Sequence, residues 1–377
     1  MISFWERESF ISYDFVIIGA GIVGLATALS IREKNPKASI AILEKGILPT
    51  GASTKNAGFA CFGSLTELLT DVRSIGSENT LDLVKTRIKG LKRLRERVGE
   101  TNLDFQQHGG YELIGKNELN AVDQLDSINE LLYPIFKSEV FHLKPRLIKD
   151  FGFDENTIKT LVYNPYEGQL DTGKMIKYLL VIAAQNGIVI HTGAEVISLE
   201  ESGKVIIKAK AHNSTVSFDA SRVIVCTNAF TKKLIPNEEL VPGRGVVLVT
   251  KPIPELRFKG TFHIDQGFYY FRDFHNRVIF GGGRNAFLEE ETSTEFEINE
   301  NILTILREKL NTTLLPNTSY SIDTIWTGIM AFGNSRQPII RWHSDKILVG
   351  VRLGGMGVAI GSEVGEKLAD MALENDV

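Results

Sequence analysis

The sequence predicts an α/β protein in which a discontinuous unit with a parallel sheet surrounds a second, α+β unit built on an antiparallel sheet. Three observations predict this architecture. Near the N-terminus an apolar β-branched run, a glycine-rich turn and an Ala/Leu-rich run follow one another. A second pattern of strand, glycine-rich turn and helix ends the sequence. Between them, from Val241 onward, aromatic and β-branched runs alternate with turn residues, as in an antiparallel sheet.

The first element is the stretch DFVIIGAGIVGLATALSI, which runs from Asp14 to Ile31. Gly19, Gly21 and Gly24 form G-x-G-x-x-G between its strand-like and helix-like parts. At such a turn the N–H groups of a new helix favour a phosphate, and glycine lets the main chain approach it closely. The pattern therefore predicts a turn that binds a pyrophosphate.

The next strand indicates a dinucleotide. The stretch ASIAILEKG, Ala38 to Gly46, is strand-like, and its Glu44 lies 20 residues after Gly24. At this spacing a dinucleotide-binding fold places a carboxylate on the ribose hydroxyls, whereas an arginine would indicate a 2′-phosphate. Strand, turn, helix, strand and acid together predict a Rossmann-like unit.

Composition limits the alternatives. The 377 residues suggest two domains, and 43% hydrophobic with 23% charged residues is ordinary for a globular protein. A net charge of −4 gives no reason to expect a nucleic-acid partner. Cys61 and Cys226 lie far apart, which indicates a reducing, cytoplasmic compartment, and no metal-ligand spacing is present. The uncharged run from Phe15 to Ile31 contains three glycines and follows an acid, so we do not interpret it as a membrane span or a signal peptide.

The segments between the motifs are interpreted in chain order. Residues 67–98 form a polar helical region whose basic stretch VKTRIKGLKRLRERVGE predicts a solvated face, and GGYELIG is strand-like. Asp171 or Thr172 is expected to cap a helix, and the strand Arg222–Cys226 is expected to join the first sheet. The expected domains are residues 1–85, 150–240 and 326–377 for the first, and 86–149 and 241–325 for the second.

Several distinctive motifs occur in an order typical of one family. They are LEKG at 43–46, GASTKNAG at 51–58, EGQLDTGKM at 167–175, VIVCTNAFT at 223–231, VPGRGVVLVT at 241–250, YYFRDFHNRVIFGGGRN at 269–285 and ILVGVRLGGMGVAIG at 347–361. The sequence resembles FAD-dependent D-amino-acid-oxidase-like (DAO) oxidoreductases over nearly its whole length, and most closely the branch of glycine/sarcosine oxidases and γ-glutamylputrescine oxidases. The resemblance implies a noncovalently bound FAD, because cysteinyl links in the family lie near the C-terminal turn and no cysteine follows Cys226 here.

The resemblance also implies a set of FAD-binding residues. The N-terminal glycines would contact the pyrophosphate and Glu44 the adenosine ribose. Ser53, Thr54 and Asn56 would offer hydrogen bonds, and the main chain of Val196 would contact adenine. A helix beginning near residue 358 would direct its N-terminus at the flavin pyrimidine edge, where negative charge develops on reduction. The full expected set is Gly19, Gly21, Ile22, Val23, Gly24, Glu44, Lys45, Ser53, Thr54, Asn56, Ala57, Gly58, Val196, Thr227, Gly354, Gly355, Met356 and Gly357.

Four residues are expected at the substrate. Tyr269 matches a position where glycine-oxidase-like members place a tyrosine against the substrate carboxylate; a stacking tyrosine is the alternative. Met330 stands where those enzymes have the arginine that pairs with this carboxylate, and methionine cannot make that bidentate contact. Arg284 aligns with a site-lining position and is expected to replace that arginine, unless it is a surface residue. Arg352, where relatives have a small residue near the flavin, is expected to contact the ring or the substrate; Arg336 is a weaker candidate.

The resemblance implies oxidation of the C–N bond of an amino acid, N-alkyl amino acid or amine by hydride transfer to flavin N5, giving an imine that hydrolyses. A 2-hydroxy-acid or D-amino-acid dehydrogenase and an inactive FAD-binding module remain as alternatives. Ile279 stands where sarcosine oxidases carry the lysine thought to assist oxygen, so O2 and another electron acceptor both stay open. The expected partner is a small molecule, with no metal.

Overall fold

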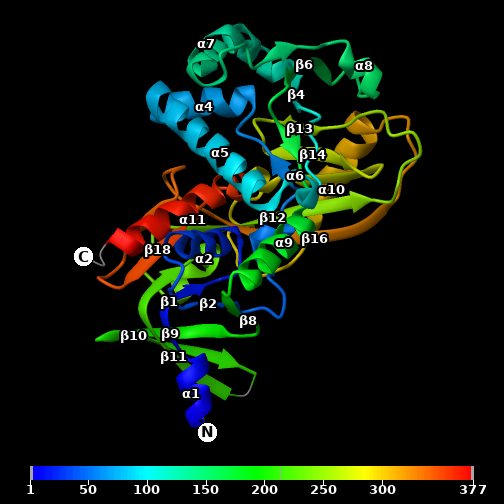
Figure 1. Ribbon diagram of the computed structural model, residues 1–377. Coiled ribbons are helices and arrows are strands. Elements are labelled where there is room, and N and C mark those ends of the chain that lie inside the picture. The colour runs from blue at the N-terminus through cyan, green and yellow to red at the C-terminus, as the bar shows by residue number, and fades with distance from the viewer. Residues whose placement is uncertain (1–2, 213, 375–377) are drawn as a thin grey trace.

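The computed structural model describes residues 3–212 and 214–374 and contains two large sheets with helices around them (Figure 1). The first sheet, in the lower half of the view, contains β1 (Ser12–Ile18), β2 (Ile40–Leu43), β8 (Val189–His191), β9 (Glu195–Ser202), β10 (Lys204–Ala211), β11 (Ser214–Val225), β17 (Ile339–Trp342) and β18 (Ile347–Val351). Its order is β17-β18-β11-β1-β2-β8, with β10 beside β11 and β9 beside β10. The five strands from β18 to β8 run parallel, which confirms the Rossmann-like prediction and the place of β11 in this sheet.

The helices that follow the two glycine motifs, α2 (Ile22–Lys34) and α11 (Gly357–Glu374), lie side by side on the first sheet (Figure 1). The first ten residues of α2 are all buried, so this part of the helix is covered on every side. A Cβ atom at Gly365 would lie 2.6 Å from the Cβ atom of Ala26, so α11 approaches α2 as closely as its backbone allows. A third helix, α9 (Thr172–Gln185), begins at the cap Asp171, whose Oδ1 accepts the N–H of Lys174 at 2.9 Å.

The second sheet contains β4 (Gly110–Gly115), β5 (His142–Leu143), β6 (Ile158–Asn164), β12 (Val241–Thr250), β13 (Thr261–Ile264), β14 (Tyr269–Phe274), β15 (Arg277–Gly282) and β16 (Ile322–Phe332). Its order is β16-β12-β15-β14-β13-β4-β6-β5, and every neighbouring pair except β13 and β4 is antiparallel. The antiparallel pairing predicted from residue 241 onward is therefore confirmed. The one parallel pair among these strands joins β13 to β4, a strand from an earlier part of the chain.

The two faces of the second sheet differ. On the outer face, a row of aromatic side chains crosses the sheet from Tyr111 through Phe262 and Phe271 to Phe280, and it packs into the core under α10 (Glu300–Lys309). The rings of Phe262 and Phe271 stack 4.5 Å apart. Because side chains alternate across a strand, the neighbours of these residues face the other way, toward the loop that follows β2. This inner face is where a site between the two sheets can form.

A helical layer completes the second unit. It contains α4 (Leu65–Ile75), α5 (Ser77–Val98), α6 (Glu100–Leu103), the 3-10 helix η1 (Lys116–Gln124), α7 (Leu125–Phe136) and α8 (Leu147–Phe151). The remaining short elements are α1 (Phe4–Phe10), α3 (Ala52–Lys55), β3 (Phe59–Ala60), β7 (Gly168–Gln169), η2 (Asn228–Lys233), η3 (Arg284–Ala286) and η4 (Leu310–Leu314). In α5 a Cβ atom at Gly90 would lie 2.1 Å from the carbonyl oxygen of Ala359, so one side of the basic helix packs against α11 rather than being wholly solvated. No helix within the described residues is long and apolar enough to cross a membrane.

The structure does not divide where the sequence suggested. The boundary expected between residues 85 and 86 falls inside the continuous helix α5, and the one between 325 and 326 falls inside β16. In addition, β6 pairs with β4 in the second sheet, although residues 150–240 were expected in the first domain. These differences share one cause: a single amphipathic segment gives no sign of which sheet it joins, because that depends on pairing with strands far along the chain.

Candidate functional site

The N-terminal glycine turn is built so tightly that only glycine fits at two of its positions. Gly19 has φ +104°, and a Cβ atom there would lie 2.9 Å from the carbonyl oxygen of Cys226. A Cβ atom at Gly24 would lie 2.0 Å from the carbonyl oxygen of Gly19. The turn therefore holds β1, β11 and α2 together, as the close strand–helix packing of a dinucleotide motif requires.

The start of α2 leaves N–H groups available for an anion. The N–H of Ile22 donates to Ser53 Oγ at 3.0 Å, and Leu25 makes the first helical bond, to the carbonyl of Gly21 at 3.0 Å. The N–H groups of Val23 and Gly24, between these two, are among the first-turn donors that have no partner inside a helix. Together with the positive end of the helix dipole they suit a pyrophosphate.

Glu44 lies at the end of β2 and is aimed at this turn. Its side chain is buried, with Oε2 accepting the N–H of Ala20 and Oε1 accepting the N–H of Gly46, both at 2.9 Å. Each carboxylate oxygen has a second lone pair for a ribose hydroxyl. Its neighbour Lys45 points elsewhere and pairs with Glu195 at 2.9 Å.

Two polar side chains of the loop of residues 51–58 bond to the main chain of the loop or of the residues just before it. Thr54 Oγ1 donates to the carbonyl of Pro49 at 2.7 Å, and Asn56 Oδ1 accepts the N–H of Gly58 at 2.8 Å. Thr54 and Asn56 were expected to offer hydrogen bonds to the cofactor, but the structure shows both holding the loop in shape. Ala57 and Gly58 follow and are buried. Gly58 has φ +77°, and a Cβ atom there would lie 2.3 Å from the carbonyl oxygen of Leu170.

Two further expected cofactor residues lie at the edges of this region. Val196 is on β9, opposite Ala209 of β10, and the preceding residue, Glu195, pairs with Lys45 after β2. Thr227 caps η2 directly after β11, and its Oγ1 lies 2.9 Å from Thr231 Oγ1. A Cβ atom at Gly19 would lie 3.8 Å from the backbone nitrogen of Thr227, so Thr227 borders the N-terminal turn.

The C-terminal glycine turn is open. Gly354 and Gly355 have φ values of +57° and +84°, and no heavy atom lies within 4 Å of a Cβ atom built at Gly354. At Gly355 such an atom would meet only Met330 Sδ, at 3.7 Å. The turn leads through half-buried Met356 to α11, which begins at Gly357, one residue before the expected position.

These features fit FAD. Both turns follow parallel strands of one sheet, β1 and β18, which lie on either side of β11 and therefore end at the same edge. Ligands of open α/β sheets bind at that edge. One turn offers free N–H groups and an acid for the dinucleotide part, and the other offers uncovered backbone in contact with the second sheet.

The inner face of the second sheet contains a strip without side chains. Gly245 of β12 pairs with Gly328 of β16, and Gly281 of β15 pairs with Val247 in the next row. Trp326 borders the strip, and its Nε1 donates to the carbonyl oxygen of Lys55 at 3.0 Å. Glycine inside a strand often marks a place where a ligand or another backbone comes close. This was the signal in the sequence that could have located the strip.

Tyr269 does not face this strip. Its side chain lies on the outer face with Phe280, and the ammonium of Lys309 lies 4.4 Å from its ring centroid. The tyrosine on the inner face is Tyr270, 5.7 Å from the ring of Phe59 in the cofactor loop. Tyr269 and Tyr270 are adjacent on β14, and successive side chains of a strand point to opposite faces of the sheet.

Arg352 also has a different role from the expected one. Its Nη1 donates to the carbonyl of Glu239 at 2.8 Å, and its Nε and Nη2 donate to the carbonyl of Gln337 at 3.2 and 3.1 Å. Its backbone is in the left-handed region, with φ +64°. The buried side chain of Arg352 therefore links its own segment to those of Glu239 and Gln337, and all its nitrogen atoms donate within the protein. The weaker candidate Arg336 is similarly engaged, by Asp71.

Arg284 and Met330 do come together at the strip. Met330 of β16 is opposite Gly243 of β12, and the Cδ atom of Arg284 would lie 3.4 Å from a Cβ atom at Gly243. The guanidinium of Arg284 lies over the ring of Phe332, 4.0 Å from its centroid. Burial lowers the pKa of this arginine. Within residues 3–212 and 214–374 it has no hydrogen-bond or ion-pair partner, so a half-buried cation is left for a ligand.

Beyond Tyr270, the inner face continues into a buried acid cluster. His263 pairs with Tyr270 on one side and with Glu112 on the other. Its Nδ1 lies 3.6 Å from Glu67 Oε2 and its Nε2 lies 3.9 Å from Glu167 Oε2. Burial raises the pKa of Glu112 to about 7, against the lowering effect of hydrogen bonds from Thr66 and Ser64.

The pKa of Glu112 predicts a pH-dependent stability. Because the folded protein holds this proton up to about pH 7, whereas the ordinary pKa is 4.5, the stabilisation is complete below pH 4.5 and is lost as pH rises to about 7. The loss is about 3 kcal/mol. Glu112→Gln keeps the neutral form at every pH, so urea unfolding of both proteins from pH 4.5 to 8 should show the difference growing in favour of the variant. Parallel pH curves would show that Glu112 does not titrate in this range.

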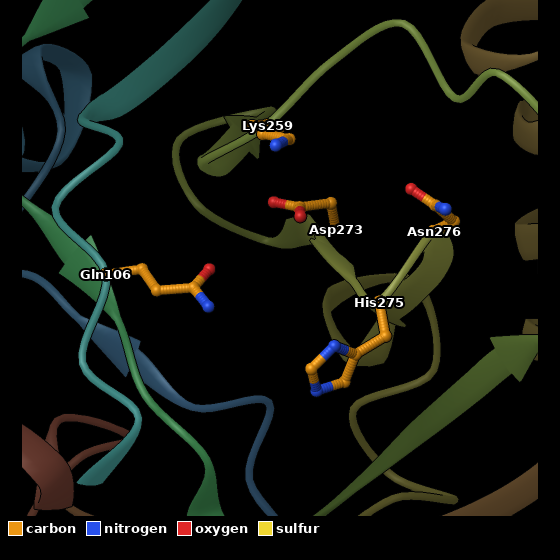
Figure 2. A pocket seen from close by; sticks show the side chains of 5 residues that line it. All are labelled: Gln106, Lys259, Asp273, His275 and Asn276. Carbon is orange, nitrogen blue, oxygen red and sulfur yellow. The ribbon is translucent and has the colours of Figure 1, made fainter. Parts of the chain in front are cut away.

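A separate cavity of about 320 Å³ is lined by residues outside the glycine turns. It is lined by Gln106, Lys259, Asp273, His275 and Asn276, and Figure 2 shows these polar side chains around it. Asp273 already accepts two hydrogen bonds within the protein: its Oδ1 accepts from Gln169 Nε2 at 3.1 Å and from the N–H of Gly260 at 2.9 Å. The cavity contains none of the expected cofactor residues. In the described part of the chain, no group of His, Cys, Asp and Glu is placed to hold a metal ion.

Comparison with known proteins gives sequence relatives over most of the chain. A protein named probable oxidoreductase OrdL from Haemophilus influenzae is 22% identical over 379 residues, covering 96% of this chain and 83% of the relative. Mitochondrial L-2-hydroxyglutarate dehydrogenase from Caenorhabditis briggsae is 24% identical over 252 residues, covering 64% of this chain and 54% of the relative.

Solved structures show the same fold. Glycine oxidase from Geobacillus kaustophilus superposes with a TM-score of 0.77 at 18% identity, covering 97% of this chain and 96% of that one. Iminodiacetate oxidase from Chelativorans sp. BNC1 superposes with a TM-score of 0.72 at 18% identity, covering 96% and 95%. These identities show a shared architecture.

The family is shown by a match to the sequence profile described as FAD dependent oxidoreductase (DAO), which spans residues 14–371. The match includes both glycine turns, Glu44 and the whole second sheet. The protein is therefore an FAD-dependent oxidoreductase, as the glycine turns and the acid after β2 predict. The chain belongs to the DAO family.

Proposed function

We propose that this protein oxidises the C–N bond of an amino acid or N-alkyl amino acid at the inner face of the second sheet. The observation that carries the proposal is the guanidinium of Arg284, which has no partner within residues 3–212 and 214–374 and lies beside Met330 and the glycine strip. It supplies the cation that a substrate carboxylate needs, at a point that the C-terminal glycine turn also borders. A simple amine without a carboxylate is the less favoured substrate, because it would leave this cation without a partner.

FAD, when bound, supplies the acceptor for the hydride that leaves the α-carbon. The residues of the chain bind and orient. Arg284 holds the carboxylate by two charge-assisted hydrogen bonds, which fixes the direction of the α C–H. The strip glycines let Phe332, Met330 and Lys55 lie close against the sheet. Met330, Phe332 and Trp326 give this face an apolar surface beside Arg284. The imine then hydrolyses to a carbonyl compound and an amine.

A 2-hydroxy acid is the second candidate substrate, and it requires the same carboxylate contact. The relative from Caenorhabditis briggsae supports it by name, and together with iminodiacetate oxidase it gives two similar proteins named for dicarboxylates. Product analysis separates the two reactions. C–N oxidation releases ammonia or a primary amine with the carbonyl product, whereas oxidation of a hydroxy acid releases no nitrogen. A D-amino-acid dehydrogenase would give the first result with D-substrates alone, and an inactive FAD-binding module would give neither product.

The electron acceptor is either O2 or another oxidant. Ile279, at the position where sarcosine oxidases carry a lysine, is buried among apolar side chains of the inner face, beside Val249. We infer a cytoplasmic location from the two free, buried cysteines, Cys61 and Cys226. The flavin is proposed to be noncovalent.

Replacing Arg284 with methionine should raise KM for a carboxylate substrate by about 10 to 1000-fold, since one charge-assisted contact is worth roughly 1.5 to 4 kcal/mol. The flavin spectrum should stay normal, because Arg284 does not contact the glycine turns. Steady-state kinetics of Arg284→Met measure this. Arg284→Lys, which keeps the charge, should recover part of the loss, and Arg146→Met, at an exposed arginine before α8, is the matched control. An unchanged KM would remove Arg284 from the site.

A further inference from the structure

We propose that the substrate is a small dicarboxylate and that Lys55 binds its second carboxylate. The inference rests on the function proposed above and adds the class of substrate. It assigns Lys55 as a specificity-determining residue, a role that nothing in its sequence motif indicates. The argument depends on where Lys55 lies relative to Arg284 and on what else surrounds the two cations.

Lys55 is fixed on the inner face of the second sheet. It is the last residue of α3, and its carbonyl oxygen accepts the Nε1–H of Trp326 at 3.0 Å. Its Cβ atom would lie 3.1 Å from a Cβ atom at Gly328, so its stem rests on the glycine strip. Its ammonium lies 5.1 Å from the ring centroid of Phe296, and no carboxylate among the described residues pairs with it.

Lys55 and Arg284 therefore approach the same strand from the same side. Lys55 rests at Gly328, which pairs with Gly245 of β12, and Arg284 rests at Gly243. Gly243 and Gly245 are two residues apart, which is about 7 Å along a strand. The side chain of Met330, opposite Gly243, lies between the two positions and carries no charge.

Two acids of the segment that carries Arg284 are paired with Arg244. Glu291 is fully buried and accepts from Arg244 Nε and Nη2, both at 2.9 Å. Glu297 lies 3.7 Å from the same arginine. Lys55 and Arg284 instead lie over the rings of Phe296 and Phe332, and a cation–π contact compensates only part of the cost of burying a charge. Both cations therefore have room for a negative partner, and the proposal gives each of them one carboxylate of the substrate.

A monocarboxylate would neutralise one of these cations and leave the other beside it. A dicarboxylate with a short linker neutralises both, with one carboxylate on Arg284 and the other on Lys55. The preference should be measurable with pairs of compounds that differ in the second carboxylate alone. Suitable pairs are iminodiacetate with sarcosine, glutamate with glutamine in both stereoisomers, and malate with lactate.

The test is the rate of anaerobic flavin reduction by each member of these pairs, using the holoprotein. We expect at least one dicarboxylate to exceed its partner in the second-order rate constant of flavin reduction by about 10 to 150-fold, the range for one hydrogen bond to a charged group. Lys55→Met should reduce this ratio by a similar factor, and Lys55→Arg should restore much of it. Lys177→Met, at an exposed lysine of α9, is the matched control and should leave the ratio unchanged.

The outcomes separate this inference from the proposed function. Reduction by sarcosine, glutamine or phenylalanine as fast as by any dicarboxylate would overturn the dicarboxylate assignment and leave C–N oxidation standing. A dicarboxylate preference that survives in Lys55→Met would overturn the role of Lys55. Loss of flavin from Lys55→Met and Lys55→Arg alike would also overturn it, because Lys55 would then be a cofactor residue. Reduction by no amine, amino acid or hydroxy acid would contradict the proposed function itself.

Discussion

Glu44→Arg is expected to lose most of its FAD. On the proposed role of Glu44, the change removes two charge-assisted hydrogen bonds to the ribose, worth roughly 1.5 to 3 kcal/mol each, which corresponds to several powers of ten in affinity. It also removes the acceptor for the N–H groups of Ala20 and Gly46, which now hold the glycine turn in place. The measurement is the ratio of flavin to protein after purification, together with the dissociation constant from flavin titration of the apoprotein.

Two variants make this result specific. Glu44→Gln keeps one carbonyl acceptor and should retain an intermediate amount of flavin. Lys45→Met changes the neighbouring residue, whose ammonium is exposed and pairs with Glu195, and should retain all of it. Full flavin occupancy in Glu44→Arg would show that Glu44 is merely a structural acid at the end of β2.

Glu291→Ala is expected to destabilise the protein by about 3 to 5 kcal/mol, the cost of leaving one member of a buried ion pair alone. Its carboxylate accepts two hydrogen bonds from Arg244 and one from Asn299 Nδ2 at 2.9 Å. The backbone N–H of Arg244 also donates to the carbonyl of Glu291 at 2.8 Å. This pair joins β12 to the segment that carries Arg284, so KM should rise as well. Urea unfolding and steady-state kinetics measure the two effects.

Glu289→Ala is the matched control, because Glu289 is exposed on the same segment and should change stability by less than about 0.5 kcal/mol. The double variant Arg244→Met, Glu291→Leu replaces the pair by apolar side chains of similar size and should recover at least half of the loss. Equal stability of Glu291→Ala and Glu289→Ala would show that the pair contributes nothing.

The cofactor half of the protein was predictable because its signals are local. The positions of Gly19 and Gly24 are dictated by contacts within a few residues or with the adjacent strand, and Glu44 follows at the end of the next strand. These constraints hold in any chain that makes this turn, so they can be read directly from the sequence. The C-terminal glycine turn is recognised from the same kind of local pattern, a strand followed by glycines and a helix.

The substrate face was predicted less well because it depends on register between distant strands. Tyr269 and Tyr270 are adjacent tyrosines of one strand, and the sequence alone does not show which of them faces inward. The pairing of β14 with β13 and β15 decides this. Arg352 is held by carbonyl groups of residues 239 and 337, which no local pattern connects to it. Arg284, by contrast, was singled out because Met330 leaves its carboxylate site without a cation, and the structure brings those two residues together.

The central claim is that a substrate with a carboxylate and an amine is oxidised at the face formed by Arg284 and the glycine strip. The most direct measurement is anaerobic mixing of the yellow holoprotein with amines, amino acids and hydroxy acids while the oxidised-flavin absorbance is followed. We predict bleaching by a carboxylate-bearing amine, with ammonia or an amine released, and bleaching slowed at subsaturating substrate in Arg284→Met. Bleaching by hydroxy acids alone, by simple amines at equal rates in both proteins, or by none of these compounds would contradict it.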